Sequence, residues 1–220
     1  MIVPQSAKNL AERFLLKSGF IWPKAVLDFL KAHASTPTAL ELAVPPAKIL
    51  VRFESAETVV GQQADQAVTL ARGHGGTAVV LTGEGETSAW RSHDARVFDS
   101  DNTIVKIAMV PSELSSILTW IDDTAKARAL DYVLIGRGGL GLLHVSLSGS
   151  LTEQSAFVAL IRERLPVGRG SAMIQRAGRG LKDLVDVWGP VGNGLRIMQE
   201  VKRRFDPTST LNPGRGPGGL

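Results

Sequence analysis

The chain has 220 residues, of which 44% are hydrophobic, and a formal net charge of +4 with no cysteine. The absence of cysteine excludes a disulfide framework, a thiolate metal site and a cysteine nucleophile, and the length suits one domain with an appendage. No apolar run approaches the roughly 18 residues of a membrane span, and the start lacks a secretory signal pattern. We therefore expect a cytoplasmic protein, since a chain without cysteine fits a reducing compartment.

The basic excess lies in the second half of the chain. Residues 121–220 hold 14 Lys and Arg against 9 Asp and Glu, a net +5, whereas residues 1–120 hold 11 against 12, a net −1. The stretches 162–170 and 174–182 supply much of this charge. Nucleic-acid-binding surfaces commonly mix aromatic residues with the basic ones, and these two stretches have no aromatic residues among their arginines. A solvated face or an anion-lined cleft is therefore favoured over a nucleic-acid site.

The first 47 residues have the pattern of an appendage. Apolar spacing predicts one short helix around residues 10–15, ending at Gly19, and a second around residues 26–30. Residues 39–44 form an apolar run suited to a strand. Pro45-Pro46 follows directly and is the best candidate for a linker. We accordingly predict a boundary that separates residues 1–47 from a domain of residues 48–220.

The remainder alternates short β-type runs with helical patterns. Strands are predicted at residues 49–55, 77–83, 103–110, 132–137, 141–147 and 170–177, and helices at 57–72, 84–93, 111–121 and 152–165. Several connections are too short for parallel crossovers, and a Gly-Gly turn between two of the strands indicates a hairpin. The pattern therefore predicts an α+β fold with a largely antiparallel sheet and helices on one face.

The C-terminal stretch carries the most distinctive residues. A basic amphipathic helix must end near Phe205, because Pro207 cannot continue it. Asn212-Pro213-Gly214 then forms a turn, followed by Arg215. One interpretation is a frayed tail. The other is that the Asn212 amide, the Gly214 N–H and the Arg215 guanidinium converge on an anionic or heteroaromatic ligand.

The residues "FDPTSTLNPGR", preceded by "VWGP" and "LRIMQEVKRR", resemble the C-terminal signature of FAD-linked oxidases of the vanillyl-alcohol-oxidase superfamily. Within it they look most like the FAD-binding E-type subunit of bacterial glycolate oxidase. The resemblance implies a ferredoxin-like cap domain from about Ile49 to the end. It also implies that Asn212, Gly214 and Arg215 contact the flavin, and that Arg176 faces the flavin ring or a phosphate.

The stretch "GRGGLGLLHVSL" departs from catalytic relatives of that superfamily, whose histidines there hold a divalent metal. Arg137, Leu140 and Leu142 stand at three of the motif positions, and only His144 is retained. A metal needs several converging ligands, so we predict no catalytic metal. His144 is then either a core histidine or a cleft residue near the substrate.

Two further motifs are ambiguous. Lys106 sits among apolar residues in a predicted strand, where it is either solvent-facing or, as the resemblance implies, a partner for a substrate carboxylate. "AWRSHD" resembles a motif whose arginine binds a substrate carboxylate, but His93 stands at the arginine position. Since a neutral imidazole does not replace a permanent cation, we expect Trp90 to pack and His93 to be a surface residue.

The resemblance implies a cap domain, on the substrate side of a flavin-dependent 2-hydroxy-acid dehydrogenase of the glycolate type. Gly-rich phosphate loops are absent before residue 48, so the flavin would be held by another polypeptide, and this chain alone should bind FAD weakly or not at all. Expected partners are that flavin polypeptide, other glycolate-oxidase-type subunits and a small 2-hydroxy acid. The alternatives are a non-catalytic assembly module and an anion- or nucleic-acid-binding protein.

Overall fold

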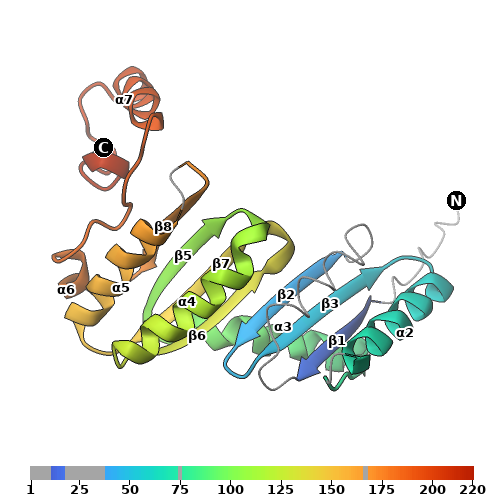
Figure 1. The fold of residues 1–220 in the computed structure, drawn as a ribbon. Helices are drawn as coiled ribbons and strands as arrows, with labels where there is room; N and C mark the ends of the chain where they lie inside the picture. Colours follow the sequence, from blue (N-terminus) through green and yellow to red (C-terminus); the bar gives the residue numbers. More distant parts are fainter. Residues whose placement is uncertain (1–10, 18–37, 74–75, 166–167) are drawn as a thin grey trace, which may run out of the picture.

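The computed structural model describes residues 11–17, 38–73, 76–165 and 168–220, which form an antiparallel sheet with flanking helices. The strands are β1 Ala11–Lys17, β2 Ala39–Val44, β3 Lys48–Glu54, β4 Val80–Leu81, β5 Thr103–Met109, β6 Asp131–Arg137, β7 Leu142–Ser148 and β8 Gly170–Arg176. The α-helices are α2 Glu57–Gly73, α3 Gly83–Phe98, α4 Leu114–Ala127, α5 Leu151–Arg164, α6 Arg179–Lys182 and α7 Gly194–Phe205. Short 3-10 turns are η1 Pro111–Glu113, η2 Gly138–Leu140 and η3 Pro217–Gly219. Figure 1 shows their arrangement, which confirms the predicted α+β class.

The sheet consists of two units with the same strand topology. Its order is β4-β1-β3-β2-β6-β7-β5-β8, and every pairing is antiparallel. The segment β5-α4-β6-β7-α5-β8 has the connectivity and strand order of a ferredoxin-like fold. The strands β1, β2, β3 and β4 repeat that spatial order in the first half. The two units meet where β2 pairs with β6, so one sheet runs through both.

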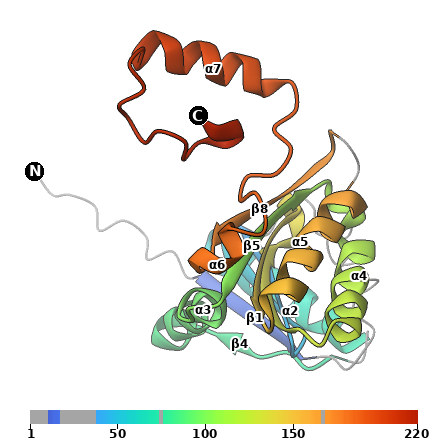
Figure 2. The same cartoon turned by 90° about the vertical axis from the view of Figure 1, so that its left-hand side faces the viewer.

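Helices cover both faces of the sheet. Figure 2 shows α4 and α5 on one side and α3 on the other. The main core lies under α2, α4 and α5, and it includes Val60, Ile117 and Phe157. A second, smaller cluster lies on the face of the sheet away from the main core, where Val97 of α3 packs against residues of the strands. The prediction that the helices lie on one face holds for α2, α4 and α5, but it is wrong for α3, predicted at residues 84–93, which packs against β1, β6 and β7 on the other face.

Local sequence explains most of these elements. In β5, Val105 and Ile107 point into the main core while Ile104 joins the opposite cluster, as strand alternation requires. Ser150 caps α5 by accepting a hydrogen bond from the Glu153 N–H at 3.2 Å. Gly141 has a φ of +64°, and a Cβ there would lie 2.0 Å from a backbone oxygen. The hairpin between β6 and β7 therefore requires glycine at that position.

Within the described part of residues 1–47, the structure differs from the sequence prediction at residues 11–17. The helix predicted around residues 10–15 is wrong, because residues 11–17 form β1, which pairs with β3 along seven positions and with β4. Nonlocal backbone pairing here overrides the helical spacing. The helix predicted around residues 26–30 lies outside the described residues. The proposed boundary at residue 47 stays a prediction, and the Pro45-Pro46 turn connects β2 to β3, which pair within the same sheet.

Leu134 offers a test of the junction between the two units. It is fully buried on β6, opposite Val44 of β2. We expect Leu134→Ala to lower the free energy of unfolding by about 2–5 kcal/mol, the range for large buried aliphatic residues, as measured by urea denaturation. Leu184→Ala is the matched control, since Leu184 is 56% exposed, and should change it by less than about 0.5 kcal/mol. Equal effects of the two substitutions would contradict the assigned core.

Candidate functional site

The C-terminal segment forms a small lobe of its own, which we define as residues 188–220. It extends beyond the β8 edge of the sheet, with α7 on its outer side (Figures 1 and 2). Two contacts close the lobe on itself. The indole N–H of Trp188 donates to the Arg215 carbonyl at 2.9 Å, and Gly218 lies so close to Leu195 that a Cβ would meet its side chain at 2.6 Å. The lobe therefore has internal structure and is not a frayed tail.

Asp206 organises the turn after α7. Its carboxylate accepts hydrogen bonds from the Thr210 N–H at 2.8 Å and the Leu211 N–H at 2.9 Å, and it pairs with the Lys202 ammonium. Only 5% of the side chain is exposed, although its cover is its own loop rather than the main core. Lys202, and then the amides of Leu211 and Thr210, hold the pKa of Asp206 well below its usual range. The residues "FDPTST" thus form a charge-assisted cap.

The three predicted flavin-binding residues follow this cap on an exposed turn. Asn212 has a φ of +47° and Gly214 a φ of +72°, and the Arg215 N–H donates to the Asn212 carbonyl at 3.2 Å. All three residues are exposed. A Cβ on Gly214 would meet no atom within 4 Å, so one side of the turn is open. The turn is shaped in advance, and its amide, bare backbone and guanidinium are accessible to another molecule.

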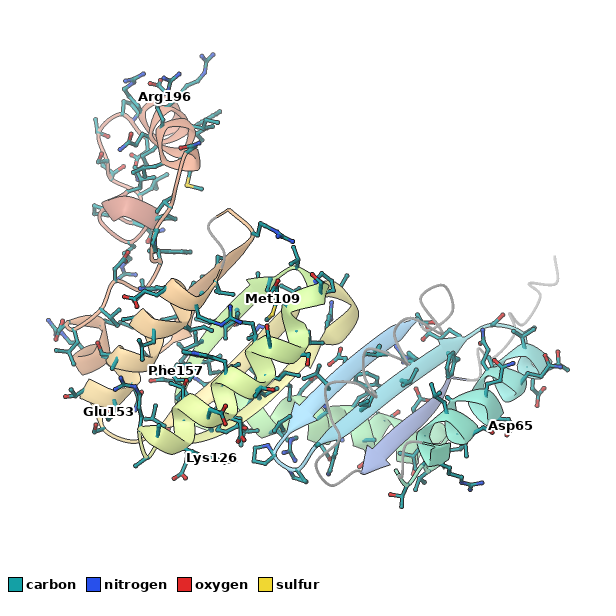
Figure 3. All side chains as sticks on the ribbon, in the orientation of Figure 1. Asp65, Met109, Lys126, Glu153, Phe157 and Arg196 are labelled. Carbon is teal, nitrogen blue, oxygen red and sulfur yellow. The ribbon has the colours of Figure 1, made fainter. Side chains whose placement is uncertain are left out.

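The apolar face of α7 is also uncovered in the described structure. Its large apolar side chains recur at helical spacing, and they are Ile197 at 68% exposure, Met198 at 42%, Val201 at 52% and Phe205 at 77%. Figure 3 shows the side chains of α7, including Arg196, standing apart from the sheet. Contiguous exposed apolar residues of this kind commonly mark an interaction surface.

Lys106 and His144 lie together on the sheet face that carries α3. They are opposite each other in the register of β5 and β7, and the ring of Phe98 on α3 contacts the imidazole with centroids 5.4 Å apart. Burial lowers the pKa of His144, and the nearby Lys106 lowers it further. Both effects favour the neutral imidazole at pH 7. Because β5 is an inner strand, Lys106 is not an edge lysine.

Arg176 has a different environment from that expected for a flavin contact. Its guanidinium donates to the carbonyl oxygens of Phe98 at 3.0 Å and Asn102 at 3.3 Å, and also to those of Val97 and Ser100. These carbonyls belong to the end of α3 and the loop after it. Arg176 thus anchors α3 to β8 with most of its N–H groups engaged. A contact with flavin stays a prediction for this residue.

His93 is not a surface residue, which corrects the sequence prediction. It is only 3% exposed, and its Nε2 lies 2.9 Å from an oxygen of Glu41 on β2. Trp90 packs edge-on against its ring, as expected, with centroids 5.8 Å apart. The sequence missed this environment because Glu41 belongs to the segment before the predicted boundary. A clear apolar face on the helix would have predicted which of its side chains point toward the sheet. The sequence of α3 is only weakly amphipathic, so it does not identify His93 as one of them.

The structure therefore brings together some of the predicted site residues and not others. Lys106 and His144 are neighbours, and Asn212, Gly214 and Arg215 form one turn. Within the described ranges, no hydrogen bond or ion pair connects that turn to the sheet face. Their convergence on one ligand would require another polypeptide segment or a different position of the lobe.

Comparison with known families points to the same lobe. Residues 188–215 match the model of the family described as FAD linked oxidases, C-terminal domain. The match supports a relationship with the C-terminal domain of FAD-linked oxidases. Its two end residues, Trp188 and Arg215, are those joined by the indole hydrogen bond. A search of curated proteins found no match. Among the described helices, none combines the length and apolar character needed to cross a membrane.

Asp206 provides a test of the lobe. We expect Asp206→Asn to speed hydrogen exchange of the Thr210 and Leu211 amides by about tenfold or more, because charge-assisted bonds are lost. Because the folded pKa is depressed, this stabilisation is complete above the ordinary value of 3.8 and is lost only as pH falls towards the lower folded pKa. The wild-type amides should thus stay protected from pH 7 to pH 4.

The matched control is Asp183→Asn, because Asp183 is exposed and lies outside the lobe. It should leave exchange at both amides unchanged at pH 7. Protection that survives Asp206→Asn, or that disappears in the wild type between pH 7 and pH 5, would contradict the role assigned to this carboxylate.

Proposed function

We propose that this chain acts as the C-terminal, substrate-side part of an FAD-linked oxidoreductase, in which another polypeptide segment holds most of the flavin. The observation that carries the proposal is the lobe. Its family match covers the segment that is closed by its own hydrogen bonds and exposes an ordered turn together with an apolar helix face. A turn that is organised yet uncovered suits docking onto a second surface better than a purely internal role.

The exposed turn fits one edge of a flavin but not a complete binding site. Asn212 offers an amide, Gly214 an unhindered N–H and Arg215 a cation, which together match the carbonyl and ring nitrogen edge of an isoalloxazine. Three contacts from one exposed turn leave the remaining surface of the cofactor to other groups. When bound, FAD would supply a hydride acceptor for oxidation of the substrate. The residues of this turn would orient that acceptor.

The face of β5 and β7 is the best candidate for the substrate side. Lys106 has no ion-pair partner in the described structure, and the neutral imidazole of His144 is adjacent to it. A permanent cation beside a neutral hydrogen-bonding ring suits the carboxylate and hydroxyl groups of a 2-hydroxy acid. We propose glycolate or a similar small acid as the substrate, and the E-type glycolate oxidase subunit as the type of protein.

A second candidate function is a non-catalytic assembly module. The specific observation that favours it is the apolar face of α7, from Ile197 to Phe205, which is uncovered in the described structure. In this case the lobe would dock onto a flavin polypeptide or another oxidoreductase subunit without contributing to substrate binding. The two functions differ in whether Lys106 affects turnover.

Flavin binding by the isolated chain is the first test. We expect the purified chain to show little or no bound flavin, because the turn offers only a few contacts. The measurement is the visible spectrum after incubation with FAD and gel filtration. Co-expression with a flavin-domain polypeptide of an FAD-linked oxidase should yield a yellow complex, and Arg215→Ala should weaken it. A stoichiometric flavin band on the isolated chain would contradict the proposal.

Lys106 provides the second test, in the assembled flavin complex. We expect Lys106→Met to reduce kcat/KM for glycolate or lactate by about 10- to 100-fold, the usual cost of losing a charge-assisted contact. Anaerobic reduction of the flavin is the measurement. Lys182→Met is the control, since Lys182 is exposed on α6. Turnover that is unaffected by Lys106→Met would remove the substrate role and favour the assembly module.

A further inference from the structure

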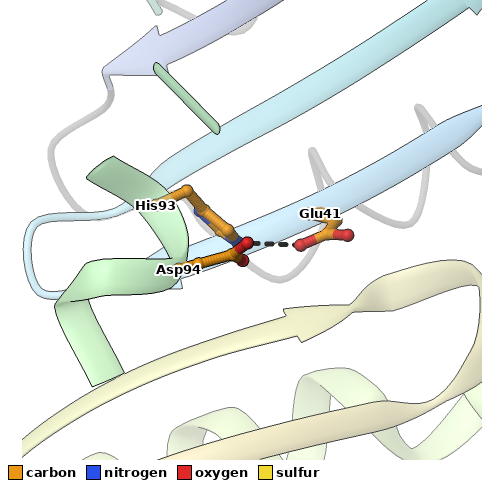
Figure 4. A group of neighbouring side chains, drawn as sticks. All are labelled: Glu41, His93 and Asp94. Atoms are coloured by element: carbon orange, nitrogen blue, oxygen red, sulfur yellow. Dashed lines mark ion pairs between the residues drawn. The ribbon is translucent and has the colours of Figure 1, made fainter. Parts of the chain in front are cut away.

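Three potential metal ligands meet between β2 and α3, away from the C-terminal lobe. Glu41 extends from β2, and His93 and Asp94 are adjacent on α3 (Figure 4). One nitrogen or oxygen atom from each side chain lies within 4.8 Å of the other two. The cluster combines one imidazole with two carboxylates. Its members come from the two sequence segments that pack together at the junction of the two sheet units.

The imidazole of His93 is buried without a satisfactory hydrogen bond. The residue is 3% exposed, and neither ring nitrogen has a hydrogen-bond partner within the described part of the chain. Nε2 lies 2.9 Å from Oε2 of Glu41, a close contact that does not have hydrogen-bond geometry. A buried polar group left unsatisfied in this way costs free energy. Nε2 is therefore positioned to bind a further group that the described residues do not supply.

We propose that Glu41, His93 and Asp94 bind a divalent transition-metal ion, of which Zn²⁺ is the representative. Ligands at about 2.0–2.2 Å in a tetrahedral site are separated by roughly 3.3 Å. The 2.9 Å between Nε2 of His93 and Oε2 of Glu41 is already close to that separation. The exposed carboxylate of Asp94, with an oxygen within 4.8 Å of the other two ligand atoms, would complete the set. Because Asp94 borders solvent, a fourth position is accessible to water.

The charges around the cluster are compatible with a dication. Two carboxylates together balance its charge. A neighbouring cation is Arg137, whose Nε lies 3.5 Å from Oε1 of Glu41, the oxygen that does not face His93. A guanidinium in that position orients the carboxylate and leaves Oε2 for the metal, as second-layer donors commonly do. The edge contact with Trp90 holds the imidazole ring from another side.

The ligands of this site differ from those whose loss the sequence indicated, although Arg137 borders both places. The expectation of no metal rested on the motif around Arg137, Leu140, Leu142 and His144, where ligands are replaced by leucines and an arginine. The cluster proposed here uses a residue of β2 that lies 52 positions before His93 in the chain (93 − 41). Its first effect would be to fasten α3 to β2. The inference does not depend on the flavin function.

Metal titration of the full chain tests the proposal. After treatment with EDTA and its removal, we expect one equivalent of Zn²⁺ to bind in calorimetry and to raise Tm. Co²⁺ should give visible d–d absorption typical of a site with one imidazole and two carboxylates. Absence of binding, of the Tm shift and of the Co²⁺ spectrum would overturn the proposal and leave an ion pair between His93 and Glu41.

Two variants assign the ligands. Asp94→Asn changes an exposed side chain, leaves the contact between His93 and Glu41 in place, and should weaken Zn²⁺ binding by at least about tenfold. Asp99→Asn is the control, because Asp99 is an exposed carboxylate at the end of the same helix, and it should retain wild-type affinity. Equal affinity of Asp94→Asn and the wild type, or equal losses in both variants, would contradict the assignment.

Discussion

The backbone pairing between β2 and β6 is the constraint on which the rest of the structure depends. Each of these strands would otherwise be the edge of a four-stranded unit with ferredoxin-like order, and such edges expose unpaired N–H and C=O groups. Pairing of Val44 with Leu134 and of Ala43 with Ile135 removes both edges. The result is one continuous eight-stranded sheet, whose core on one face is shared by α2, α4 and α5.

That junction also determines what the opposite face of the sheet contains. Since α3 contacts β1, β6 and β7, it packs across both units. Its packing buries His93 beside Glu41, and its C-terminal end is fixed by Arg176 from the last strand. The remaining part of this face carries Lys106 and the neutral His144. Charged and imidazole groups are therefore concentrated on the face that α3 covers only in part.

The C-terminal lobe follows a different principle. Its order comes from local hydrogen bonds to Asp206, from the bond between Trp188 and Arg215, and from the contact of Gly218 with Leu195. Few of its apolar side chains are covered, and α7 has no buried residue. A segment whose order comes largely from its own contacts can present its shape to a partner. The family match covers residues 188–215 of this lobe.

The sequence by itself determined the elements whose pattern is local. Alternation defined β5, spacing and Pro111 defined the helix that became α4, and Pro207 fixed the end of α7. The α+β class followed from those patterns and from the short connections between them. The turn at Asn212–Arg215 was likewise predicted from the conformational preferences of Asn, Pro and Gly.

Only the tertiary structure decided the features that depend on distant partners. Residues 11–17 have helical spacing but form a strand, because β3 and β4 supply their hydrogen bonds. Arg176 binds carbonyl oxygens more than 70 positions earlier in the chain, and His93 is buried beside Glu41 of β2 where α3 packs on the sheet. Local propensity amounts to a fraction of a kcal/mol per residue, whereas the hydrogen bonds of a paired strand and the burial of a large side chain together involve several kcal/mol. A short stretch of sequence therefore does not contain the partners whose interactions determine where these residues lie.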